Sequence, residues 1–457
     1  MKPIVEKIKS IVGAENVLTE YEERYCYSYD ASWYRAAVPD VVVRPHTTEE
    51  VVMIVKLANE EKIPITPRGA GTNLTGGAVP VKGGIVMDMS GMNKILEINR
   101  TNLTAVIEPG VVHEELEKEL AKYGLFWPPD PASSSTCTMG GVLAECAGGM
   151  RALKYGTARD WVLGLEVALP TGEVIKTGAI TLKSVTGFDL TRLFVGSEGT
   201  LGIITKAFLK LRPIPEALLR ISAAFREIET AGLAVGKILE AGIVPTIMEI
   251  VNIDFIRSIN KWLKLGLPEV DAIMIIDLDG TQEEVEKLGE KVEKVLKDVG
   301  AMEIKRATTA KEMEELYLAR KAAYPSLFQV LTKTAVPDDY CVPINKLPEA
   351  FKLTRETAQK WGMHTAMLAH AGDGNIHPVW SVDARNPEEV DRVLKCYHEM
   401  CRGILKIGGS VSAEHGVGIG KAPFVEAEYG KKVVEIMQAI KKIFDPNNIM
   451  NPGKKGL

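Results

Sequence analysis

A glycine-rich loop reads Pro-Arg-Gly-Ala-Gly-Thr-Asn-Leu-Thr-Gly-Gly at residues 67–77, directly after a short strand-like run at residues 63–66. Its glycines allow main-chain N–H groups to converge on an anion without obstruction by Cβ atoms. The loop differs from the dinucleotide-binding fingerprint, because Leu74 occupies the position of the third glycine, and it lacks the Gly-Lys-Ser/Thr of a P-loop. It therefore predicts a phosphate-binding loop of another kind.

This loop lies at the end of a predicted β-α-β unit. The valines at residues 41–43 predict a strand, Thr47 and Glu50 have the spacing of a capping box that opens a helix, and residues 63–66 predict the next strand. Further strand-like segments lie at residues 84–89, 104–107 and 162–169. We therefore expect sheet and loops to dominate the first part of the chain.

Two more glycine clusters follow the loop, one running from residue 138 to residue 156 and one at residues 196–202. A single glycine cluster is explained equally well by turns in the chain as by a nucleotide-binding role. Three of them between residues 67 and 202 favour a large nucleotide, because covering FAD requires close approach of the backbone along its pyrophosphate, ribitol and ring systems.

The chain has 457 residues, more than one hydrophobic core holds, so we expect two or three domains. A proline-rich boundary at residues 213–215 separates a first predicted domain (1–213), which contains the glycine clusters, from a second (214–422). Beyond the boundary, strand-like and helical segments alternate in α+β fashion. The last part, residues 423–457, is predicted to be a helical C-terminal segment, with one helix at residues 425–444.

Composition excludes several classes of function. The formal net charge is -5, so no global positive field exists to bind nucleic acid. The N-terminus lacks the apolar core of a signal peptide, and no apolar run approaches the roughly 20 residues that span a bilayer. The six cysteines form no Cys-x-x-Cys pair, which argues against a zinc ribbon or an iron-sulfur cluster. We expect a cytoplasmic protein with reduced thiols, without a transmembrane segment, and peripheral to the membrane only through a partner.

Histidines cluster in the second half. Three of the seven, His364, His370 and His377, fall within 14 residues, so chance is a poor explanation. Between the last two, Asp373-Gly374 is a tight-turn signal with apolar flanks, which predicts a β-hairpin. On one straight strand, imidazoles seven residues apart would face opposite sides, so the turn is needed for them to share a ligand. The role of His364 stays open.

Downstream, residues 412–421 add Glu414 and a further histidine, His415, in a glycine-rich loop. Two imidazoles and one carboxylate suit a divalent transition metal, such as Zn, Fe or Mn, that keeps open coordination positions. A hydroxy acid could fill those positions. A lone histidine is more often a packed core residue, but the combined pattern favours a metal site.

The first half resembles the FAD-binding half of the vanillyl-alcohol oxidase/p-cresol methylhydroxylase flavoproteins over most of residues 36–210. The motifs that carry the resemblance are the 67–77 loop, Trp-Pro-Pro-Asp-Pro at 127–131, Thr-Gly-Phe-Asp-Leu at 186–190, residues 196–205 and the tail at 448–454. With the second half added, the chain resembles the branch that contains the glycolate oxidase catalytic subunit and the FAD-linked D-lactate dehydrogenases. The resemblance implies a two-subdomain PCMH-type FAD-binding domain, an α+β (ferredoxin-like) substrate cap domain and a helical C-terminal segment that returns to the FAD domain.

The resemblance also implies which residues contact FAD, with Asn451 near the flavin. No histidine or cysteine lies in the 67–77 loop, so we expect the flavin to be bound non-covalently. The expected cofactor-binding residues are Pro67, Arg68, Gly69, Ala70, Gly71, Thr72, Asn73, Gly76, Pro131, Ser135, Thr138, Gly141, Gly148, Glu198, Ile203, Ile204 and Asn451.

Residue roles in the second half follow from the same resemblance. In relatives with this pattern, the positions matching His370, His377 and Glu414 bind the metal, and the position matching His415 is the base. The position matching Arg320 binds the substrate carboxylate, the alternative being a solvated helix arginine.

The expected function is that of a FAD-dependent dehydrogenase that oxidises a D-2-hydroxy acid, of the D-lactate or glycolate type, to the 2-oxo acid. The hydride goes to flavin N5, while the metal and His415 assist removal of the hydroxyl proton. Some relatives that act on dicarboxylates carry a polar residue where this chain has Val379, which disfavours a large dicarboxylic substrate.

The electrons must then reach a protein or quinone acceptor, and we expect a partner such as an electron-transferring flavoprotein or an iron-sulfur subunit. Homo-oligomerisation is left open. Two other functions also stay open at this point. One is a metal-dependent hydrolase, and the other is a FAD-binding relay subunit of an electron-transfer complex.

Overall fold

The computed structural model describes residues 2–34, 36–329 and 333–457. The chain divides into two compact units. The first comprises residues 1–148, 157–214 and 414–457, and the second comprises residues 149–156 and 215–413. In the part of the chain that the structure describes, no helix has the length and apolar character needed to cross a bilayer.

These limits differ from the predicted ones at two places. Residues 149–156 belong to the second unit, because Lys154 and Tyr155 bind the carboxylate of Asp279 there. The return to the first unit begins at Glu414 instead of residue 423, because the residues that follow are held by first-unit side chains, such as Glu198.

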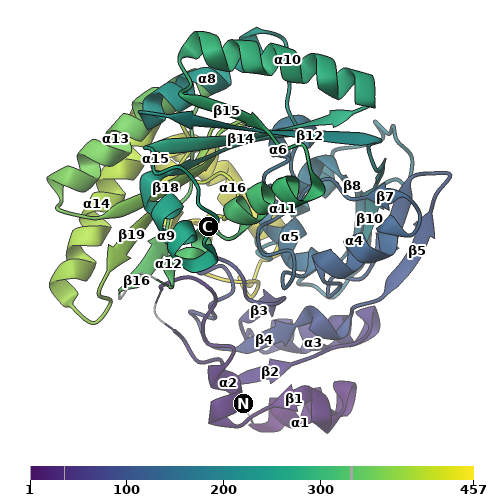
Figure 1. The fold of residues 1–457 in the computed structure, drawn as a ribbon. Coiled ribbons are helices and arrows are strands. Elements are labelled where there is room, and N and C mark those ends of the chain that lie inside the picture. The colour runs from purple at the N-terminus through teal and green to yellow at the C-terminus, as the bar shows by residue number, and fades with distance from the viewer. Residues whose placement is uncertain (1, 35, 330–332) are drawn as a thin grey trace. The chain divides into compact units, whose positions relative to one another are not determined.

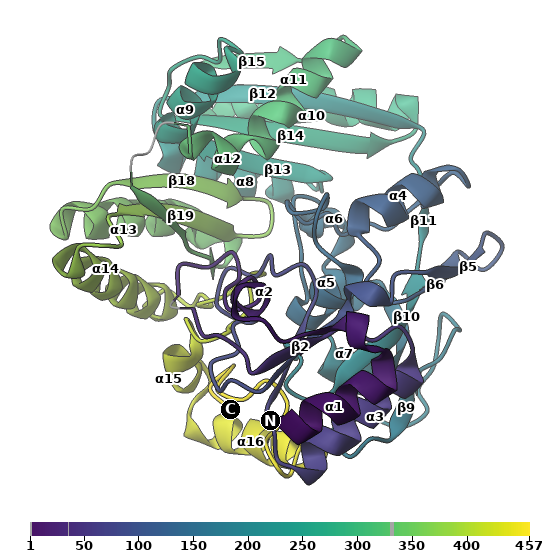
Figure 2. The ribbon, with the colours of Figure 1, turned by 90° about the horizontal axis from the view of Figure 1, so that it is seen from below.

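The first unit begins with a four-stranded sheet in the order β1-β2-β4-β3. β2 and β3 both pair in parallel with β4, and the helix α3 connects them, as the predicted β-α-β unit requires. α1 and α3 lie side by side (Figure 2), and their apolar residues form one core with the sheet. The elements are α1 (Lys2–Val12), β1 (Val17–Leu18), α2 (Tyr21–Tyr25), β2 (Val41–Val43), α3 (Thr48–Glu60), β3 (Ile65–Arg68) and β4 (Ile85–Asp88).

A second sheet in this unit has five antiparallel strands in the order β5-β6-β10-β8-β9. Its strands are β5 (Ile95–Asn99), β6 (Thr104–Ile107), β8 (Val162–Ala168), β9 (Val174–Gly178) and β10 (Ile203–Lys210). The other elements are α4 (His113–Ala121), β7 (Leu125–Phe126), α5 (Met139–Glu145), α7 (Leu190–Phe194) and β11 (Arg212–Pro213), the last pairing with β7.

The C-terminal segment returns to β3. Ile65 donates its N–H to the carbonyl of Ile449, and Asn451 donates to the carbonyl of Ile65. The single helix predicted at residues 425–444 is wrong, since the chain forms α15 (Val425–Tyr429) and α16 (Lys431–Phe444) with Gly430 between them at a φ of 81°. That dihedral lies outside the helical region.

The second unit is built on one large antiparallel sheet in the order β15-β12-β14-β13-β18-β19-β16, with β17 also paired to β19. Its strands are β12 (Ala217–Phe225), β13 (Ile247–Asn252), β14 (Ala272–Gly280), β15 (Glu303–Arg306), β16 (Thr334–Pro337), β17 (Tyr340–Cys341), β18 (Thr365–His370) and β19 (Asn375–Val382). The strand β14 is buried almost throughout, as its unbroken apolar run at residues 272–276 predicts.

Helices cover both faces of this sheet. α9 (Ile253–Leu263) and α12 (Ala323–Leu327) pack on the face that carries Ile273 and Ile275, and α11 (Ala310–Lys321) precedes α12. α10 (Gln282–Val299) lies along β12 and β14 (Figure 1). The remaining helices are α6 (Ala152–Tyr155), α8 (Ile228–Glu240), α13 (Leu347–Lys360) and α14 (Pro387–Lys406). A capping box of Thr281 and Glu284 opens α10.

Candidate active site

A β-hairpin in the second unit brings His370 and His377 together. His370 ends β18 opposite Asn375, and His377 lies two residues further along β19. The turn between them needs glycine at Gly374, where φ is 87° and a Cβ would lie 2.0 Å from the carbonyl oxygen of Val342. The two imidazole centroids are 5.1 Å apart with ring planes at 87°, and each side chain is buried. The hairpin prediction is confirmed.

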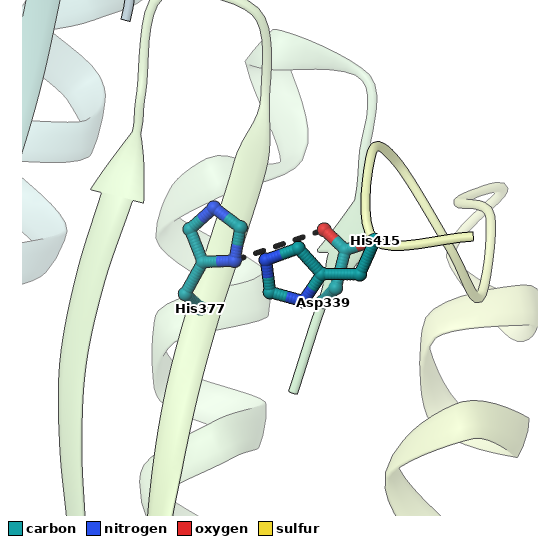
Figure 3. A group of neighbouring side chains, drawn as sticks. All are labelled: Asp339, His377 and His415. Carbon is teal, nitrogen blue, oxygen red and sulfur yellow. Dashed lines mark ion pairs between the residues drawn. The ribbon is translucent and has the colours of Figure 1, made fainter. Parts of the chain in front are cut away.

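Each of the two imidazoles has its Nδ1 atom turned to an acceptor. Nδ1 of His370 lies 2.8 and 2.9 Å from the carboxylate oxygens of Glu249. Nδ1 of His377 lies 3.2 Å from the carbonyl oxygen of Asp338 and 3.7 Å from Oδ1 of Asp339 (Figure 3). Because these oxygens only accept, each Nδ1 carries a proton, and the neutral form of each ring then has its lone pair on Nε2. Ligand atoms of the two rings lie within 4.8 Å of each other.

Arg320 occupies the same region of the second unit. It is 6% exposed, so the alternative of a solvated helix arginine is wrong. Its Nε donates to Glu249, and its Nη2 lies 3.3 Å from Nδ1 of His370. Glu249 thus contacts both predicted residues. Sequence reasoning missed it, although a carboxylate inside the apolar run Ile247-Met-Glu-Ile-Val251 was a usable signal.

Asp339 is a second residue that sequence reasoning missed. Besides its ion pair with His377, it accepts hydrogen bonds from Asn375 Nδ2 at 2.7 Å, from Ser412 Oγ at 3.1 Å and from the amide of Ala413 at 2.7 Å. The last two contacts fix the end of the second unit, and Glu414 and His415 are the next two residues of the chain.

In the first unit, the backbone of His415 is held by the glycine-rich loop at residues 67–77. Asn73 Nδ2 donates to the His415 carbonyl at 3.1 Å, and the hydroxyl of Thr75 lies 3.2 Å from the same oxygen. Oδ1 of Asn73 in turn accepts the amide protons of Thr75 and Gly77. The loop predicted to bind FAD therefore also fixes the main chain of the predicted base.

Several buried polar atoms fit a polar ligand at this loop. Thr138 Oγ1 and Asn451 Oδ1 are buried without a hydrogen-bond partner among the described residues, whereas Asn451 Nδ2 donates to the carbonyls of Gly77 and Glu198. Glycine fits at position 69 beside Thr138, since a Cβ on residue 69 would lie 2.0 Å from Oγ1 of Thr138. Buried polar groups normally find partners, so these two atoms fit a polar ligand beside this loop.

Other predicted cofactor residues differ in their surroundings. Glu198 accepts the amide protons of Val417 and Gly418 at 2.8 and 2.7 Å, and Lys455 lies 2.9 Å from its Oε1, so its oxygens already have partners in the chain. Ser135 is exposed, whereas Ile203 and Ile204 are buried in β10. Burial raises the pKa of Glu145, and the nearby charge of Glu198 raises it further.

Comparison with known proteins places these features in a family. A model of the C-terminal domain of FAD linked oxidases matches residues 214–455, and a model of the FAD binding domain matches residues 39–178. The chain belongs to the FAD-linked oxidases. Glycolate oxidase subunit GlcD of Bacillus subtilis is 40% identical over 454 residues, covering 99% of this chain and 96% of that protein. D-lactate dehydrogenase of Anaerostipes hadrus is 35% identical over 464 residues, covering 99% of this chain and 96% of that protein.

Solved structures show the same fold. A crystal structure of p-cresol methylhydroxylase with bound substrate aligns with a TM-score of 0.84 at 22% identity, covering all of this FAD-linked oxidase and 96% of that chain. The predicted PCMH-type fold, the FAD cofactor and the assignment as an oxidoreductase are thereby confirmed.

Proposed function

We propose that this FAD-linked oxidase is a dehydrogenase that oxidises a D-2-hydroxy acid, of the D-lactate or glycolate type, to the 2-oxo acid. The observation that carries the proposal is the buried pair of imidazoles, His370 and His377, whose Nδ1 atoms are engaged by Glu249 and by the Asp338 carbonyl and which have ligand atoms within 4.8 Å of each other. Relatives named glycolate oxidase subunit and D-lactate dehydrogenase support the substrate class.

The proposed ligands of a divalent Zn, Fe or Mn ion are His370, His377 and Glu414. Glu414 follows Ala413, whose amide is bonded to Asp339 at 2.7 Å, and successive Cα atoms are about 3.8 Å apart. Glu414 is therefore the next residue after one that hydrogen-bonds Asp339, and Asp339 is the carboxylate that contacts His377. When bound, the metal lowers the pKa of a coordinated hydroxyl group.

The remaining residues have separate tasks in the proposed reaction. Arg320 is oriented by Glu249 through Nε, which leaves guanidinium N–H groups to bind the substrate carboxylate. His415 takes the hydroxyl proton, and the contacts from Asn73 and Thr75 to its carbonyl fix the backbone from which its ring extends. When bound, FAD supplies the acceptor for the hydride from C2.

The proposed cofactor cradle consists of the glycine-rich loop with Thr138 and Asn451, whose buried oxygens lack other partners among the described residues. We propose that a protein or quinone acceptor, such as an electron-transferring flavoprotein or an iron-sulfur subunit, then receives the electrons. A cytoplasmic location, at the membrane only through that partner, is part of the same proposal.

Anaerobic mixing with substrate tests the proposal. D-lactate or glycolate should bleach the flavin absorption, L-lactate should not, and removal of the metal by a chelator should abolish bleaching. His415→Asn should keep the flavin and slow bleaching by about 10²- to 10⁴-fold, the usual contribution of a general base. A wild-type protein whose flavin stays oxidised with every D-2-hydroxy acid would contradict the proposal and favour a relay subunit.

A further inference from the structure

Glu249 is a buried carboxylate in an apolar strand. It lies at the centre of β13, opposite His370 on β18 and Ile275 on β14, and is 1% exposed. A carboxylate in such surroundings is strongly disfavoured unless its charge and its lone pairs are satisfied by partners. Its partners therefore indicate why this strand contains a charge.

The carboxylate of Glu249 has two partners from different elements. Nδ1 of His370 lies 2.8 Å from Oε1, and Nε of Arg320, from α11, donates to Oε2. Because a carboxylate only accepts, Nδ1 of His370 must carry its proton, so the ring presents Nε2 as its basic nitrogen. The contact of Arg320 Nη2 with Nδ1, at 3.3 Å, is then a contact between two donors, held together by the carboxylate beside them.

We propose that Glu249 is a positioning residue that acts on two groups at once. It fixes the tautomer and ring orientation of His370 for a metal ion, and it fixes the guanidinium plane of Arg320 for a substrate carboxylate. The inference rests on the proposed function, since it requires His370 to bind a metal. A carboxylate suits the requirement, because both of its oxygens accept, whereas glutamine replaces one of them by an NH2 group that donates toward the N–H groups of His370 and Arg320.

The unit contains a matched control at Asp277. This carboxylate is 2% exposed on the neighbouring strand β14, and accepts from Nε and Nη2 of Arg220 at 2.6 and 2.5 Å. It forms the same kind of buried carboxylate-arginine pair as Glu249, but among the described residues it hydrogen-bonds neither of the two histidines. Asp277→Asn therefore measures the general effect of neutralising a buried carboxylate in this sheet.

The test is Co²⁺ binding to the flavin-loaded protein and its variants, followed by the visible d–d absorption and by competition with a chromophoric chelator. Glu249→Gln should weaken Co²⁺ binding about 10- to 100-fold, the usual effect of losing a hydrogen-bond partner behind a metal-ligating histidine. It should also raise the KM for D-lactate through Arg320. Asp277→Asn should bind Co²⁺ within about twofold of the wild type.

Glu249→Asp keeps both acceptor oxygens at a shorter reach and should bind Co²⁺ with intermediate affinity. The Glu249→Asp variant also provides the test of Co²⁺ binding if Glu249→Gln does not fold. Co²⁺ affinities equal to that of the wild type in both Glu249 variants would overturn the inference while leaving the metal site intact. Absence of a Co²⁺ spectrum in the wild type would instead overturn the metal part of the proposed function, and this inference with it.

Discussion

Lys454 gives the protein a pH-dependent stability that can be worked out from the structure. The side chain is 1% exposed, and Nζ donates to the carbonyls of Gly76 and Val79 at 2.8 and 2.6 Å, at the end of the glycine-rich loop. Burial lowers the pKa of Lys454 to about 8 from its ordinary value of 10.5, although Asp30, Glu198 and Glu145 oppose the change.

The sign follows from proton linkage. Below pH 8 the lysine is protonated in both the folded and the unfolded chain, and burial disfavours the folded state. Between pH 8 and 10.5 the folded chain has released a proton that the unfolded chain still holds, so the free energy of unfolding rises with pH. From pH 7 to pH 10 this one residue should add about 2.5 kcal/mol.

The assay is urea unfolding of the wild type and of Lys454→Met at several pH values between 7 and 10. Other groups titrate in this range in both proteins, so only the difference between the two pH dependences is used. Lys297→Met, at an exposed lysine of α10, is the control and should keep the wild-type pH dependence. Parallel curves for the wild type and Lys454→Met would refute the reasoning, because the lysine would then titrate alike in both states.

Three other changes test separate parts of the structure. Thr75→Val removes a hydroxyl near the His415 carbonyl and should slow substrate bleaching of the flavin about fivefold, as the loss of about 1 kcal/mol predicts, with unchanged flavin content; an unchanged rate would contradict the role given to this contact. Arg220→Met leaves the buried Asp277 without its cation and should lower the free energy of unfolding by about 3–5 kcal/mol in urea titrations, whereas a loss below about 1 kcal/mol would show that water reaches the pair. Lys62→Gly, at an exposed position with a φ of 54°, should raise the unfolding free energy by about 0.5–1 kcal/mol, and a decrease would show that the lysine side chain makes a stabilising contact.

Local sequence signals predicted the hairpin and missed what lies beside it. Asp373-Gly374 between apolar flanks was sufficient to bring His370 and His377 together, because a tight turn is determined by adjacent residues. Glu249 and Asp339 reach the same imidazoles through strand pairing and chain segments far apart in the sequence. No periodicity within a strand specifies which strand lies next to it.

The glycine-rich loop shows the same limit. Its place after a strand could be predicted, because the preceding apolar run is a local feature. The interactions of Glu198 could not be predicted, since they join this residue to the amides of Val417 and Gly418. The break at Gly430 was missed because the apolar pattern on both sides continues with helical spacing.

The return of the tail to β3 has a consequence for synthesis on the ribosome. Asn451 donates to Ile65, so the edge of β3 that faces away from β4 lacks a partner until residues 449–451 have been translated. At about 5–20 residues per second, that wait lasts about 20–80 s. The second unit, residues 149–156 and 215–413, is therefore translated in full before the first unit can complete the outer edge of β3.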